Sequence, residues 1–67
     1  MNRFAIYTGP TLVQWVAEKL RQKEDITVTI EGTAHVHVAT PYSRDYVLGL
    51  MPSIGSGWTH RDIRQLP

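Results

Sequence analysis

Cysteine is absent from the sequence. Disulfide bridges and thiolate metal sites are therefore excluded, and an apolar core must hold the fold together. Long hydrophobic stretches are absent as well. The longest purely apolar run is the four residues FAIY, whereas a membrane-spanning helix needs roughly 20. Because the first residues also lack the apolar segment of a signal peptide, we expect a cytoplasmic protein without membrane contact.

An excess of charge of one sign is missing too. Seven Lys and Arg stand against six Asp and Glu, which gives a formal net charge of +1. This balance is far from the strongly basic one of proteins that bind phosphate backbones, so overall charge favours no class of partner. The 67 residues fit one domain, residues 1–67, and a chain of this length hides only about 60% of the surface of its unfolded form. We expect modest stability, or stability shared with a partner.

The motifs of common enzyme classes are also lacking. There is no cysteine nucleophile, no G-x-S-x-G turn and no P-loop, and the short "GSG" segment lacks the flanking strand and helix of a dinucleotide-binding loop. So short a chain has little room for a ligand pocket of ordinary size. We therefore predict a protein that is not an enzyme and holds no cofactor.

The first half of the chain has clear periodic patterns. The stretch RFAIYT, which ends before Gly9 and Pro10, alternates apolar and other residues and predicts a strand. The next segment places Leu12, Val16 and Leu20 four residues apart, the spacing of an amphipathic helix, which we expect from about Thr11 to about Lys23. Thr11 and Gln14 have the form of a capping box at its start.

A hairpin of two strands should follow this helix. Ile26, Val28 and Ile30 alternate with polar residues, and the alternation resumes after Gly32. Both apolar sets can face one core only if the loop has an odd number of residues, and we assign it to residues 31–33 with Gly32 at a positive φ. His35 then lies across from Thr29 and His37 across from Thr27, with all four side chains on the face away from the core.

The remaining segments give weaker signals. Residues 42–51 are predicted as a helix capped by Ser43, with Tyr46, Val47, Leu50 and Met51 on one side, although a further strand is the alternative. Residues 58–67 resemble a short terminal helix capped by Thr59, with Ile63 facing inward. The predicted fold is α+β, with the order β-α-β-β-α plus this terminal helix, and the helices cover one face of an antiparallel sheet.

The two histidines are the first candidates for chemistry. His35 and His37 project from the same side of one strand, roughly 7 Å apart at the backbone, which is close enough to chelate one metal ion. The sequence places no third ligand beside them, although His60, Asp62 and Glu31 are candidates. They could also form an acid–base pair with a nearby cation. The simpler interpretation is that histidines and threonines line a solvated sheet face, so we predict no metal site.

Binding of another macromolecule is the function that this composition favours. Exposed Trp, Tyr and Arg anchor protein interfaces, and a free strand edge can pair with another chain or with a second copy. We predict a small interaction protein, such as an inhibitor, adaptor or regulator, whose partner is a protein. The alternative is a nucleic-acid-binding module that uses the histidine-bearing face with the C-terminal arginines. The candidate partner-binding residues are Tyr7, Trp15, Thr27, Thr29, His35, His37, Tyr42, Arg44, Arg61 and Arg64.

Overall fold

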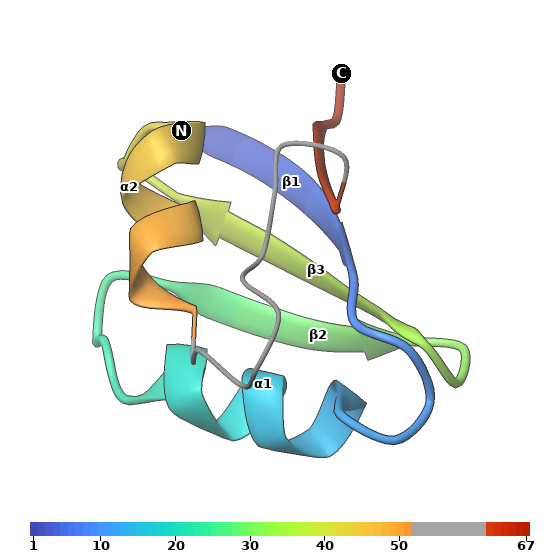
Figure 1. The fold of residues 1–67 in the computed structure, drawn as a ribbon. Coiled ribbons are helices and arrows are strands. Elements are labelled where there is room, and N and C mark those ends of the chain that lie inside the picture. Colours follow the sequence, from blue (N-terminus) through green and yellow to red (C-terminus); the bar gives the residue numbers. More distant parts are fainter. Residues whose placement is uncertain (52–61) are drawn as a thin grey trace.

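A computed structural model describes residues 1–51 and 62–67 of the chain, and Figure 1 shows its ribbon. The predicted α+β class and the order β-α-β-β-α are confirmed, and a fourth strand follows. The elements are β1 (Asn2–Tyr7), α1 (Val13–Arg21), β2 (Thr27–Glu31), β3 (His35–Thr40), α2 (Arg44–Leu50) and β4 (Ile63–Gln65). In the described part of the chain, no helix has the length and apolar character needed to cross a membrane.

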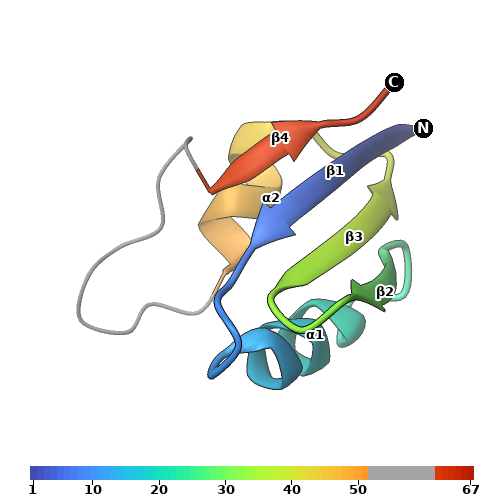
Figure 2. The same cartoon turned by 90° about the vertical axis from the view of Figure 1, so that its right-hand side faces the viewer.

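The four strands form one antiparallel sheet in the order β2-β3-β1-β4. Both helices lie on the same side of this sheet, as Figures 1 and 2 show. An element order of β-α-β-β-α-β, with β1 and β3 in the centre, is the split β-α-β arrangement called ferredoxin-like. Many unrelated functions occur on such a scaffold, so the arrangement locates a site without naming its chemistry.

The core lies between the sheet and the helices. Every second residue of each central strand points into it, including Phe4 and Ile6 of β1 and Val36 and Val38 of β3. From the helices come Val13, Val16, Ala17 and Leu20 of α1 and Val47 of α2. The period of two in the strands and the four-residue spacing in the helix are therefore read correctly from the sequence.

The start of α1 differs from the prediction. The helix begins at Val13 rather than at Thr11, and Leu12 occupies the N-cap position without any side-chain hydrogen bond to the first turn. The predicted capping box of Thr11 and Gln14 is therefore wrong. Gly9, at a φ of +78°, and Pro10 carry the chain through a turn that extends to Leu12, so Thr11 stands one residue too early to act as the cap.

The hairpin has the predicted faces but a different register. The loop comprises Gly32, Thr33 and Ala34 rather than residues 31–33, and Gly32 has the expected positive φ, 66°. Pairing is consequently shifted by two residues, so that Glu31 faces His35 and Thr29 faces His37. Because a shift of two preserves the side of every residue, the histidines and threonines still share one face. Thr27 lies across from Ala39 instead of His37.

The C-terminal elements contain one confirmed and one wrong prediction. Residues 44–50 form the helix α2, so the alternative of a strand there is wrong, and the Ser43 side chain caps it by accepting a hydrogen bond from the Tyr46 N–H. The terminal helix is contradicted because Ile63–Gln65 form β4. Backbone bonds of 2.7 Å from Tyr7 N–H to the Asp62 carbonyl and from Leu66 N–H to the Arg3 carbonyl dock this strand on β1. Thr59 lies outside the described residues.

Candidate functional site: the open face of the sheet

The face of the sheet opposite the helices, here called the open face, gathers polar side chains from all four strands. The strand register arranges them in three rows that each cross the sheet from β2 to β4. The rows are Glu31, His35, Tyr7 and Asp62; then Thr29, His37, Ala5 and Arg64; then Thr27, Ala39, Arg3 and Leu66. The predicted sharing of one face by His35, His37, Thr27 and Thr29 is confirmed, and Tyr7 and Arg64 lie on the same face.

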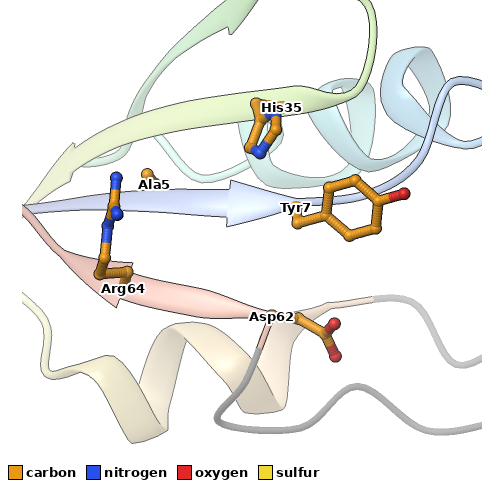
Figure 3. Close-up of a pocket in the computed structure, with 5 residues that line it drawn as sticks. All are labelled: Ala5, Tyr7, His35, Asp62 and Arg64. Atoms are coloured by element: carbon orange, nitrogen blue, oxygen red, sulfur yellow. The ribbon is translucent and has the colours of Figure 1, made fainter.

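A hollow of about 180 Å³ lies at one end of the open face. Ala5 forms its floor, because this small side chain stands between larger neighbours that leave it only 7% exposed. Figure 3 shows His35 and Arg64 on the strands that flank β1. Tyr7 lies at the end of β1, and Asp62 lies where β4 begins. The Tyr7 and His35 rings make an edge contact with their centroids 5.2 Å apart. Tyr7 nevertheless remains 50% exposed, so its ring is available to a partner.

A second hollow, of about 150 Å³, lies on the same face and has no described lining residue in common with the first. Its lining includes His37, Arg3 and the polar side chains of β2. The His37 Nδ1 atom lies 4.0 Å from a carboxylate oxygen of Glu31, so a protonated imidazole would form an ion pair there. Each histidine thus shares its hollow with one arginine, His35 with Arg64 and His37 with Arg3.

This division bears on the two chemical hypotheses for the histidines. The two imidazoles line different hollows, whereas an acid–base pair must reach the same bound substrate. For a metal ion, a third ligand is required beside the pair. Within residues 1–51 and 62–67, no three His, Asp or Glu side chains come together in a way that could hold a metal.

Other predicted partner-binding residues lie elsewhere. Trp15 belongs to α1 on the helix side of the sheet and is 37% exposed. Arg44 is the exposed first residue of α2. Arg61 and His60 lie outside the described residues. The structure therefore does not bring Trp15 or Arg44 into the histidine-bearing face.

Tyr42 is engaged in a corner of the fold rather than on the open face. Its hydroxyl donates a hydrogen bond to the Asp25 carboxylate, and its ring stacks on Tyr46 with centroids 4.2 Å apart. The bond to Asp25, together with partial burial and the nearby negative charge, raises the pKa of Tyr42 to about 12. Tyr46, which the sequence places on one side of the helix with Val47, is 43% exposed, whereas Val47 is 0% exposed. This pair of rings joins the start of α2 to the turn before β2.

The candidate partner-binding residues predicted from the sequence omit six members of the open face, which are Arg3, Ala5, Glu31, Ala39, Asp62 and Leu66. Arg3 and Ala5 alternate with the buried Phe4 and Ile6, so the period of two already placed them beside Tyr7, but nothing in the sequence indicated that β1 is central. Asp62 joins the face only because β4 is a strand. Three residues are too few to produce a recognisable alternation.

Comparison of the chain with models of protein families, with curated proteins and with solved structures finds no match.

Proposed function

We propose that this protein is a non-enzymatic binding module that occupies a surface of another macromolecule, a protein, with the open face of its sheet. One observation carries this proposal. In the described part of the chain both helices pack on one side of the sheet, and the other side presents one tyrosine, two arginines and two histidines. Tyr and Arg are the residues that most often anchor protein interfaces.

The mixture of charges supports a protein as the partner. The cations Arg3 and Arg64 share the face with the carboxylates of Glu31 and Asp62, which stand at the two ends of one row. Opposite charges interspersed with an exposed aromatic ring suit the mixture of polar and aromatic residues in a protein interface. Carboxylates at these positions would instead repel a phosphate backbone.

The small volumes of the two hollows support a contact surface rather than an active site on the open face. Pockets for ordinary small ligands measure about 300–1,000 Å³, whereas the two hollows of the open face measure about 180 and 150 Å³. Hollows of this size suit single side chains of a partner. A larger depression of about 450 Å³ lies on the helix side, where the described lining is Lys19, Leu20, Gln22, Lys23 and Leu50.

Single-stranded nucleic acid is the second candidate partner, and one observation favours it. Tyr7 and His35 stand on the two central strands with their rings in contact, and Arg64 lies beside them. Bases stack on aromatic rings, imidazoles and guanidinium groups of exposed sheets. Such a complex would weaken steeply with rising salt, whereas an aromatic-anchored protein contact would weaken little.

Capture from an extract of the source cell tests the proposal. The immobilised chain is compared with a Tyr7→Ala, Arg64→Ala double variant, which changes the open face, and with Trp15→Ala, which changes the helix side. We expect one protein to be retained by the chain and by Trp15→Ala, before and after nuclease treatment, and to be lost with the double variant. Circular dichroism establishes that all three chains are folded.

Two outcomes contradict this assignment. Retention by the double variant with loss in Trp15→Ala would move the contact surface to the helix side. Loss of binding after nuclease treatment, with a steep dependence on salt, would replace the protein partner by nucleic acid.

A further inference from the structure

The outer edge of β2 is unprotected. β2 is an end strand of the sheet, and no other described element pairs with its outer side. Proteins usually blunt such edges with lysine, proline or a bulge. Here the strand reads TVTIE, with neither lysine nor proline and with a single charged residue, Glu31, at its end, and all five residues stay in regular register with β3. By contrast, the opposite edge strand β4 has only three residues.

The hydrogen-bond pattern identifies which backbone groups are free at this edge. The Thr8 N–H donates to the Ala34 carbonyl, so the even-numbered residues of β3 turn their backbone groups toward β1. Odd-numbered residues of β3 therefore bond β2, through its odd-numbered partners Thr27, Thr29 and Glu31. The N–H and C=O groups of Val28 and Ile30 consequently point away from the sheet.

Apolar side chains at this edge are also incompletely covered. Val28 and Ile30 point to the helix side, yet both are only half-buried, whereas Val36 and Val38 opposite them on β3 are 0% and 2% exposed. A strand laid against the outer edge would cover these two side chains and bond their backbone groups at once.

We propose that two copies of the chain pair through the outer edges of β2 to form a symmetric dimer with one continuous eight-stranded sheet. The strand is complementary to itself in the antiparallel direction. With Thr29 facing Thr29 of the second copy on the two-fold axis, Val28 faces Ile30 on either side, and each such pair exchanges two backbone hydrogen bonds. This is the register that uses both outward-facing residues and keeps every contact within the strand.

The charges along β2 are compatible with this register. Glu31 is the sole charged residue of the strand and would face Thr27 of the second copy, so no like charges stand opposite each other. The two Glu31 side chains would be separated by about four residues, or roughly 14 Å along the strands. Across the axis, two threonines can exchange a hydrogen bond on the open face. The dimer would place two copies of the open face side by side, and this inference does not depend on what the open face binds.

The proposal is tested by placing a charged side chain at position 29, which lies on the proposed two-fold axis of the dimer. Sedimentation equilibrium over a concentration series should show the mass of the unmodified chain rising from 7.6 kDa toward twice that value. Thr29→Lys and Thr29→Glu should each weaken the dimer by about ten-fold or more, since like charges would face each other. A mixture of the two variants should regain the doubled mass, because the ammonium group of one copy then faces the carboxylate of the other.

Thr27→Lys is the matched control, on the same strand and the same face. Its new cation would face Glu31 of the second copy, so its dimer should be at least as stable as that of the unmodified chain. Thermal melting establishes that each variant is folded. An unmodified chain that stays monomeric at the highest concentration would overturn the proposal. So would a Thr29→Lys chain that dimerises undiminished, or a mixture that fails to recover the doubled mass.

Discussion

At the scale of single residues, Tyr42 links the protonation of a side chain to the fold. Its hydrogen bond to Asp25 raises its pKa to about 12, above the usual value of about 10. The folded state therefore keeps this proton in a range where the unfolded chain has lost it. The stabilisation is fully present below about pH 10 and disappears as the pH rises through about 12.

Spectrophotometric titration of the tyrosines checks this prediction. Subtracting the curve of Tyr42→Phe from that of the unmodified chain isolates the Tyr42 ionisation, which we expect near pH 12. Asp25→Asn should lower this midpoint toward about 10, because a neutral amide no longer favours the protonated phenol. An unchanged midpoint in Asp25→Asn would show that the hydrogen bond does not control the ionisation.

At the scale of elements, the two helices differ in how they begin, and this difference gives a second prediction. The Ser43 hydroxyl oxygen accepts a hydrogen bond from the Tyr46 N–H, with 3.2 Å between oxygen and nitrogen, whereas Thr11 makes no capping bond. We expect Ser43→Ala to lower the free energy of unfolding by about 1 kcal/mol, which corresponds to a melting temperature lower by about 4–8 °C. Thr11→Ala should change the stability by less than about 0.5 kcal/mol.

Thermal melting of the two variants measures both effects. Equal losses in Ser43→Ala and Thr11→Ala would mean that the capping box read from the sequence exists after all. The sequence alone assigns a cap to both residues, because Ser and Thr stand at suitable positions before each apolar pattern. The turn through Gly9 and Pro10 leaves Thr11 one residue before the N-cap position of α1, whereas Ser43 occupies the N-cap position of α2 and its hydroxyl reaches an N–H group.

The elements with a long apolar pattern could be predicted from the sequence, and those without one could not. Leu12 to Leu20 and Ile26 to Val38 repeat their periods several times, so α1, β2 and β3 were found with the correct faces. The register of the hairpin was not fixed, because loops of residues 31–33 and 32–34 satisfy the same parity. β4 was missed because its pairing depends on β1, more than 50 residues away along the chain.

The candidate site could likewise be predicted only where its residues belong to a local repeating pattern. The histidines and threonines of the open face could be placed together because they belong to one hairpin, whose alternation is local. Arg64 could not be assigned to the same hollow as His35, because their proximity depends on the order of strands in the sheet. Conversely, residue type alone makes Trp15 and Tyr42 candidates for partner binding. Residue type does not indicate whether a side chain lies on the helix side of the sheet or on the open face.

At the scale of the whole molecule, the short strand β4 completes the sheet and holds a part of the core. Ile63 is 2% exposed and packs with the buried cluster, although its strand has only three residues. Ile63→Ala should cost about 2–5 kcal/mol, a large fraction of the stability of so small a domain. The nearby Gln65→Ala, at an exposed position of the same strand, should cost less than about 0.5 kcal/mol.

Amide hydrogen exchange can distinguish detachment of β4 from unfolding of the whole domain. This is possible because the N–H groups of Tyr7, in β1, and of Thr8, which follows it, donate hydrogen bonds to opposite sides. The Tyr7 N–H donates to Asp62 beside β4, whereas the Thr8 N–H donates to Ala34 beside β3. If β4 detaches as a unit, Ile63→Ala accelerates exchange at Tyr7 far more than at Thr8. Equal acceleration at both amides would show instead that β4 and the three longer strands open together, so that the sheet unfolds as one cooperative body.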